Sequence, residues 1–158
     1  MPEPLMEVPA HVLDYLAAQQ TLSLATASPD GEPHAATMLY ASDGATIYIW
    51  TRDKTTTAAH LEKNGRVSFT IDDRSPIWDQ ASGVQGSGSC EPVQDGGQIV
   101  ELIGLFSEKF DQAVAEESTT GISFYRITPT NLRFIGGAKP RGEGKQEPIG
   151  ADFREEKV

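Results

Sequence analysis

Apolar and polar residues alternate with a period of two along much of the chain, which is the pattern of half-buried β-strands. We expect strands over 21–27, 34–41, 45–50, 67–71, 83–93, 121–127 and 131–135. Pro129 separates the last two, because proline cannot donate to a strand ladder. Ser28-Pro29-Asp30-Gly31 has the residues of a tight turn, and Asp43-Gly44 favours a hairpin. The first three strands should therefore form a meander.

Three other segments carry apolar residues at helical spacing. We expect helices from Pro9 to near Gln20, over 55–63 and over 98–110. Asp53 or Thr55 can cap the start of the middle helix, and Asn64-Gly65 predicts a left-handed end for it. The predicted fold class is mainly β with flanking helices, in a single domain whose first helix covers one end of a barrel.

The start of the middle helix combines several groups that bind anions. A helix start offers unpaired backbone N–H groups and a partial positive charge, so that a phosphate can bind there. Four hydroxyl donors surround this point: Thr51, Thr55, Thr56 and Thr57. Arg52 and Lys54 add positive charge, whereas Asp53 repels an anion unless it caps the helix or points to solvent. An ordinary surface helix with a polar cap is the alternative, and this stretch alone favours that alternative.

Charge and composition narrow the classes of partner. The chain has 158 residues and a formal net charge of −10, which argues against binding nucleic acid or an anionic membrane. No Lys or Arg precedes Arg52, and four of them lie within 52–66, so this segment favours a small anion. Cys90 is the single cysteine and cannot form a disulfide within the chain. With no secretory signal or membrane-spanning run, we expect a cytoplasmic protein.

Two features leave alternatives open. Trp78 lies in a polar loop where it can stack on a flat ligand, or close the barrel rim or a subunit contact. Gly86 and Gly88 are two residues apart in a strand, so both remove a side chain from the same face. That face can admit a ligand ring, or equally a neighbouring strand of a tightly curved barrel.

No catalytic or metal-binding pattern is found in the side chains. The sequence around Ser87 lacks the spacing of a hydrolase nucleophile, and the three histidines have no partners at metal-ligand spacing. Asp72 and Asp73 are adjacent, so they point to opposite faces of a strand. We therefore expect no metal and no catalytic side chain, and a bound cofactor should carry any chemistry.

The stretches GEPHAATMLYA, IYIWTRDKTTTAAHLEKNGRVSF and GVQGSGSCEPV, in this order, resemble the pyridoxamine 5'-phosphate oxidase-like family of flavin-binding split barrels. The resemblance implies a six-stranded split barrel over 1–137, a tail over 138–158, and a homodimer that holds FMN between its subunits. The implied cofactor-binding residues are Thr37, Met38 and Leu39 at the ring, Trp50 and Thr51 at the ribityl chain, Arg52, Lys54, Thr55, Thr56 and Thr57 at the phosphate, and also Trp78 and Gln85.

Two departures limit what the resemblance implies about the substrate. Pyridoxamine phosphate oxidases of this family commonly carry Arg-Lys where Thr56-Thr57 stands here, and Arg-x-His where Arg133-Phe134-Ile135 stands. We therefore do not expect pyridoxamine phosphate oxidation, and the few Lys and Arg residues disfavour a deazaflavin. The resemblance favours an FMN-dependent oxidoreductase that uses a nicotinamide or other small donor. The alternative is a non-catalytic protein that stores or senses FMN or haem.

Overall fold

A computed structural model describes residues 7–73, 82–111, 119–136 and 153–157. The helices are α1 (Ala10–Ala18), α2 (Thr56–Lys63) and α3 (Gly96–Phe110). The strands are β1 (Thr21–Ala27), β2 (Pro33–Asp43), β3 (Thr46–Arg52), β4 (Arg66–Asp72), β5 (Gly83–Val93), β6 (Ile122–Gly136) and β7 (Phe153–Lys157). Trp78 and most of the predicted C-terminal tail lie outside the described residues.

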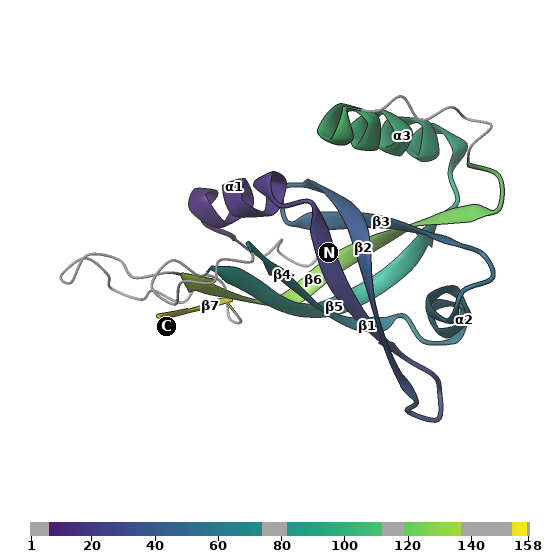
Figure 1. The fold of residues 1–158 in the computed structure, drawn as a ribbon, viewed down its shortest axis with the longest axis horizontal. Helices are drawn as coiled ribbons and strands as arrows, with labels where there is room; N and C mark the ends of the chain where they lie inside the picture. Colours follow the sequence, from purple (N-terminus) through teal and green to yellow (C-terminus); the bar gives the residue numbers. More distant parts are fainter. Residues whose placement is uncertain (1–6, 74–81, 112–118, 137–152, 158) are drawn as a thin grey trace, which may run out of the picture.

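The strands form one sheet that closes on itself. Its order is β3-β2-β1-β4-β5-β6-β7, and a further pairing of β3 with β6 joins the two sides (Figure 1). All pairings among β1 to β6 are antiparallel, whereas β7 runs parallel to β6. The predicted six-stranded barrel is confirmed. Residues 153–157, within the predicted tail, add a seventh strand outside the closed ring.

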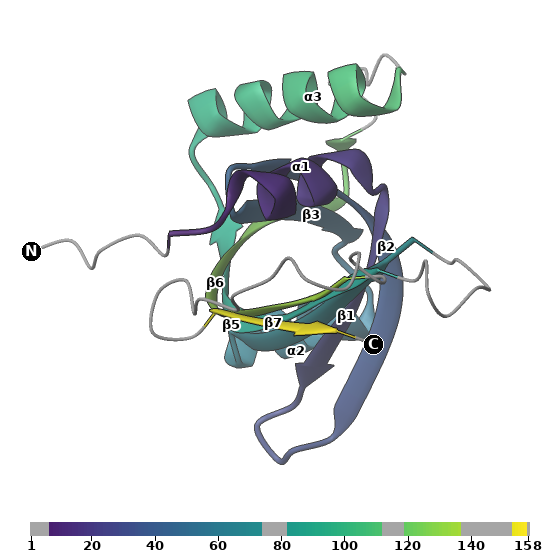
Figure 2. The same cartoon turned by 90° about the vertical axis from the view of Figure 1, so that its left-hand side faces the viewer.

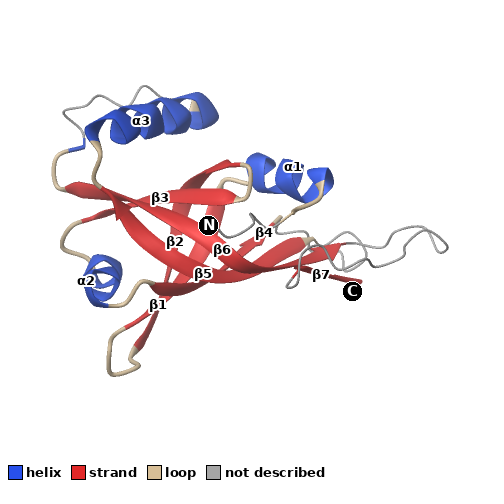
Figure 3. Ribbon diagram, turned by 180° about the vertical axis from the view of Figure 1, so that it is seen from behind, coloured by secondary structure: helices blue, strands red, loops and turns tan. Residues whose placement is uncertain are grey.

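The helices cover different parts of the barrel. Figure 2 looks along the barrel, with α1 at the near end and α3 outside, above β3. Figure 3 shows from behind that α2 lies at the end remote from α1. None of the described helices is long and apolar enough to cross a membrane.

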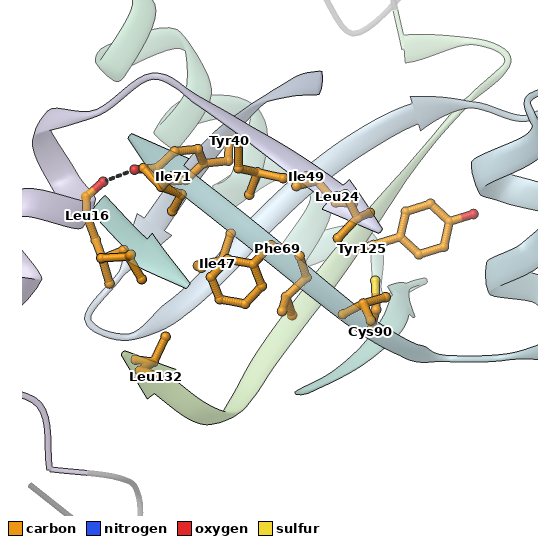
Figure 4. Close-up of a cluster of buried hydrophobic side chains, with 14 of the residues drawn as sticks. Leu16, Leu24, Tyr40, Ile47, Ile49, Phe69, Ile71, Cys90, Tyr125 and Leu132 are labelled. Atoms are coloured by element: carbon orange, nitrogen blue, oxygen red, sulfur yellow. Dashed lines mark hydrogen bonds between the residues drawn. The ribbon is translucent and has the colours of Figure 1, made fainter. Parts of the chain in front are cut away.

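Two apolar clusters stabilise this arrangement. The larger cluster fills the barrel and includes Ile47, Ile49 and Phe69, with Leu16 of α1 closing one end (Figure 4). The smaller cluster lies between α3 and the outer face of the sheet, where Leu102 and Phe106 are buried. Strand alternation explains the division, because successive residues of β3 point into the barrel and towards α3 in turn.

β6 corrects the prediction of two strands broken at Pro129. It is one strand from Ile122 to Gly136, with a bulge: Ser87 of β5 pairs with Asn131 and the next residue, Gly88, pairs with Pro129. The additional residue reverses the alternation. Ile127 and Leu132 consequently both point into the barrel, although five positions separate them. Phe124, three positions before Ile127, points to the other face and packs against α3.

The glycines of β5 allow strands to approach inside the barrel. A Cβ atom on Gly86 would overlap the ring of Phe69, and one on Gly88 would overlap the Thr128 carbonyl of β6. Of the two alternatives left open by the sequence, the close approach of neighbouring strands is therefore the one that the structure supports.

The end of α2 differs from the predicted left-handed stop. Asn64 is extended, with φ −143° and ψ 106°, and Gly65 has no positive φ. Instead, the Asn64 amide donates to the Ala27 carbonyl at 3.3 Å, and the Cys90 N–H donates to the Gly65 carbonyl at 2.7 Å. Bonds to β1 and β5 thus end the helix, which fixes α2 on the barrel.

Candidate functional site

The start of α2 is held by a network of threonine hydroxyls. The Thr55 hydroxyl oxygen accepts from the Ala58 N–H at 3.1 Å and donates its proton to the Arg52 carbonyl at 3.0 Å. The Thr51 hydroxyl lies 3.0 Å from the same oxygen. Because Thr55 has one proton and has donated it, Thr51 must be the donor of that third bond. Thr55, one of the two caps considered, is therefore the N-cap.

This network divides the residues predicted to bind a phosphate into those with a structural role and those that are exposed. The Thr55 and Thr51 hydroxyl protons are both donated within the network, and Thr57 is only 2 % exposed. Arg52, Lys54 and Thr56 have exposed side chains beside the helix start. The backbone N–H groups of Thr56 and Thr57 lie in the first turn, where a helix has no internal acceptor. An anion would meet these exposed side chains and backbone donors.

Asp53, the acidic residue of this segment, is turned away from the helix start. Its carboxylate accepts from the Ser123 hydroxyl of β6 at 2.5 Å, and its N–H donates to the Gly121 carbonyl at 2.9 Å. The Asp53 carboxylate therefore has a hydrogen-bond donor, and it does not cap α2. The bond to Ser123 holds the carboxylate, which keeps its negative charge, against β6 and not at the cap of α2.

The predicted ring-binding residues lie where β2 and β3 separate. These strands are paired only from Tyr40 to Asp43 and from Thr46 to Ile49. Beyond this point β2 pairs with β1 through Leu39, Met38 and Thr37, and β3 pairs with β6 through Trp50 and Thr51. We call these two segments, 37–39 and 50–52, the β2–β3 fork. The helix α2 contacts β1, β2 and β3.

Side chains at the fork do not all face the same way. Thr37 is exposed and Leu39 is 40 % exposed, whereas Met38, between them, packs against the barrel core. The indole of Trp50 packs against the α3 cluster. Among these four, Thr37 and Leu39 offer side chains to a molecule outside the barrel, so Met38 would contribute its backbone.

Gln85 lies in a groove on the outer face of the sheet. The groove has a volume of about 740 Å³ and is lined by small and polar residues: Ser23, Leu24, Ala25, Ala35, Ser68, Phe69, Thr70, Gln85, Gly86, Ser87, Asn131 and Arg133. Among these lining residues Arg133 carries the only charge. Outward positions of β1 and β4 thus bear serine, alanine and threonine, a repetition visible in the sequence but not recognised there as a surface.

The strand registers relate the groove to the fork. Thr37 pairs with Ser23, Ser23 with Thr70, and Thr70 with Gln85. With neighbouring strands about 4.8 Å apart, Thr37 and Gln85 are about 14 Å apart along the sheet. Thr37 and Gln85, two predicted cofactor contacts, therefore lie on the same face of the sheet but at separate positions on it.

Two buried titratable groups near α2, the Tyr125 phenol and the Cys90 thiol, have raised pKa values. Burial raises the pKa of Tyr125, and Cys90 and Asp53 add to the increase through their charge. Burial likewise raises the pKa of the Cys90 thiol to about 12, so at neutral pH it is not a thiolate nucleophile.

Two histidines lie together near the start of β2. The His34 and His60 rings are 6.0 Å apart, and His60 Nδ1 is 3.0 Å from the Thr26 hydroxyl. Within the described ranges, no group of three or more His, Cys, Asp or Glu residues could hold a metal ion.

Sequence patterns did not identify the Asp53–Ser123 bond or the groove around Arg133. The bonded residues are 70 positions apart, so no local signal links them. Arg133 was noted for its place in the family pattern, but only the register with Gln85 shows that the two are neighbours.

Solved structures with the same fold include several bacterial proteins. Conserved hypothetical protein Rv2991 from Mycobacterium tuberculosis superposes with a TM-score of 0.73 at 23% identity, over 96% of this chain and 98% of its own. HutZ, a haem storage protein from Vibrio cholerae, superposes with a TM-score of 0.68 at 16% identity, over 80% of this chain and 94% of its own. A haem-binding protein from Mycobacterium smegmatis superposes with a TM-score of 0.63 at 20% identity, over 85% of this chain and 57% of its own.

No curated protein matches this sequence. The family model described as pyridoxamine 5'-phosphate oxidase matches residues 8–136, which include all six strands of the closed barrel. This match covers most of the chain and agrees with the barrel topology. The chain therefore belongs to the pyridoxamine 5'-phosphate oxidase family.

Proposed function

We propose that the protein is an FMN-dependent oxidoreductase that acts as a homodimer on a small substrate. The observation that carries this proposal is the start of α2, where a neutral cap, backbone donors and two exposed cations surround one point. These groups fit the dianionic phosphate of FMN.

Several of the predicted residues would have distinct parts in binding the cofactor. Lys54 and Arg52 supply charge to the phosphate, and Thr56 supplies a hydroxyl together with the first-turn N–H groups. Thr51 and Thr55 hold the turn in shape through their hydrogen bonds. Thr37 and Leu39 present the surface beside which the ring would lie. Bound FMN would supply hydride or single-electron transfer, and the protein would orient it and exclude water from one face.

The positions of the fork and Gln85 support a site shared by two subunits. They lie about 14 Å apart across three strand spacings, so a ring held at Thr37 does not reach Gln85 of the same chain. The small side chains of the outer groove allow a second barrel to approach closely. Gln85 of one subunit would then complete the site formed by the fork of the other.

Removal of the exposed phosphate donors tests the site. We expect Lys54→Ala combined with Thr56→Ala to weaken FMN binding by about 2 to 4 kcal/mol, the scale of one charge-assisted and one neutral hydrogen bond. Lys63→Ala is the matched control, since Lys63 is an exposed lysine at the other end of the same helix. Titration followed by flavin fluorescence measures the FMN affinity of the double variant and of the control. Equal affinity in the double variant and the control would exclude this phosphate site.

Anaerobic reduction tests the enzymatic part of the proposal. NADH or NADPH added to the FMN-loaded protein, with no oxygen or other electron acceptor present, should bleach the flavin absorbance. Flavin that stays bound and oxidised under both donors would contradict a nicotinamide-dependent enzyme and support a carrier.

Haem binding is the second candidate, because two of the similar structures are named as a haem storage and a haem-binding protein. In this chain the half-buried pair His34 and His60 is the local source of an iron ligand, and His60 keeps Nε2 available while Nδ1 meets Thr26. A Soret band that appears on haem addition and shifts in His60→Ala would favour this function over the flavin enzyme.

A further inference from the structure

A small pocket lies between α1, β2 and α3, away from the start of α2. It has a volume of about 300 Å³ and is lined by Ala17, Ala41, Ser42, Leu105, Glu108 and Lys109. Figure 2 shows α3 above α1, with β2 running down one side of the barrel. The pocket shares no lining residue with the fork or with the outer groove.

Lys109 has an unusual environment for a lysine. Its Nζ is buried and has no hydrogen-bond partner among the described residues. The nitrogen lies 4.0 Å from the centre of the Tyr40 ring and 5.7 Å from that of Phe110. A lysine ammonium normally binds carboxylates or water, because an unpaired charge in an apolar setting is costly. Here, aromatic rings replace those partners.

Tyr40 does not provide the missing negative charge. Its hydroxyl donates to the Leu16 carbonyl at 2.5 Å, the bond drawn in Figure 4. Burial raises the pKa of Tyr40 well above its ordinary value, so the ring next to Lys109 is a neutral phenol. Its face attracts the ammonium through a cation–π contact, which is weaker than a buried ion pair.

Desolvation increases the fraction of the amine that is neutral. Burial lowers the pKa of Lys109 from 10.5 to about 8. At pH 7 this raises the neutral fraction of the amine by roughly 300-fold, since each unit of pKa is a factor of ten. The titratable groups at the pocket are Tyr40 on β2 and Glu108 on α3, while α1 contributes Ala17.

We propose that Lys109 is an imine-forming lysine, and that the pocket at α1, β2 and α3 takes up a small neutral aldehyde. The amine nitrogen attacks the carbonyl carbon, and the carbonyl oxygen leaves as water together with both amine protons. A C=N bond replaces the C=O bond, so no oxidant or reductant is required. Lysine amines in apolar pockets are the ones activated for this chemistry.

The pocket lining selects the class of aldehyde. Ala17, Ala41 and Leu105 offer apolar surface, and the volume is at the lower end for a small-molecule site. The Glu108 carboxylate disfavours an anionic molecule in the same space. A single uncharged ring or a short aliphatic aldehyde fits both conditions.

Reductive trapping tests the assignment. The full-length protein is treated with benzaldehyde and sodium cyanoborohydride at pH 7, and peptide mass spectrometry locates the added benzyl groups. We expect Lys109 to be labelled about tenfold faster than the exposed Lys54 and Lys63, with a rate that rises as the pH approaches 8. Labelling of Lys109 that is no faster than that of Lys54 overturns the proposal.

Two variants and a second probe separate the pocket from general reactivity. Lys109→Arg keeps the positive charge and should abolish the fast label. Ala17→Leu leaves the lysine in place and fills the pocket, so it should slow labelling at Lys109 and leave Lys54 unchanged. Unchanged labelling in Ala17→Leu would refute the role of the pocket. The anion 4-carboxybenzaldehyde should react more slowly than benzaldehyde, and equal rates would refute selection of neutral aldehydes.

Discussion

The helices α2 and α3 begin with the same type of cap but with opposite electrostatic results. Thr55 accepts from the Ala58 N–H at 3.1 Å, and Asp95 accepts from the Gln98 N–H at 2.9 Å. Asp95 is a carboxylate, so it neutralises the positive end of α3 within the protein. Thr55 is neutral and leaves the positive end of α2 available. The start of α2 therefore suits an anion better than the start of α3, whose cap carries a negative charge.

Cations lie beside both helix starts. Arg52 and Lys54 flank α2, and the nearby Asp53 is bonded to Ser123. The first turn of α3 contains Gly96 and Gly97, and the Arg126 guanidinium of β6 donates to the Gln98 side chain at 2.7 Å. The charge of the cap is therefore the difference that leads us to expect a phosphate at the start of α2 and not at that of α3.

Giving α2 the cap of α3 should have the largest effect. Thr55→Asp keeps an acceptor for the Ala58 N–H but loses the bond that Thr55 donates to the Arg52 carbonyl, so we expect the thermal midpoint to fall by a few degrees. A carboxylate about 5 to 6 Å from the phosphate should weaken FMN binding by about 3 kcal/mol, or roughly 150-fold. Isothermal titration measures the affinity, and Thr55→Ser is the control that changes the cap without changing its charge. Equal affinities in the two variants would show that cap charge does not decide where an anion binds.

Release of Asp53 should have a smaller effect. In Ser123→Ala the Asp53 carboxylate loses its donor and can turn towards the α2 start. We expect FMN affinity to fall by about 1 kcal/mol, or roughly fivefold, because the added charge is mobile and exposed to solvent. The same titration at two salt concentrations should show the loss shrinking at the higher one. In the combined variant Asp53→Asn with Ser123→Ala, the FMN affinity should return to that of the parent protein. An affinity that stays low would mean that the loss in Ser123→Ala comes from a change in the fold and not from the Asp53 charge.

Removal of the cap charge from α3 should have the smallest effect. Asp95→Asn retains a capping side chain and loses the charge, so we expect a decrease of about 0.5 kcal/mol in the free energy of unfolding. Urea denaturation followed by circular dichroism measures it. FMN affinity should be the same as in the parent protein, and a change in it would mean that the two helix starts are coupled.

Local patterns predicted most of the barrel and not its irregularities. Alternation identified the strands, because one face of each packs on the core, as with Ile47 and Ile49. The bulge in β6 escaped prediction since it depends on pairing with Gly88, 41 positions before Pro129. The pairing of β7 with β6 is equally non-local.

The candidate site was predicted as a set of residues but not as a geometry. The threonines and cations of 51–57 are adjacent in sequence, so a local motif could identify them. Their division into structural hydroxyls and exposed donors depends on which protons Thr51 and Thr55 donate. The separation of Gln85 from Thr37 follows from strand order, which sequence periodicity does not contain.

The additional residue in β6 also limits how this chain can change in length. Deletion of Thr130 would remove the bulge and restore simple alternation, and Leu132 and Phe134 would keep their inward direction. Deletion of two consecutive residues at the bulge would place Ile127 and Leu132 three positions apart, so that one of them would turn to the solvent. In descendants of this sequence, a gap at this point of β6 should therefore be a single residue.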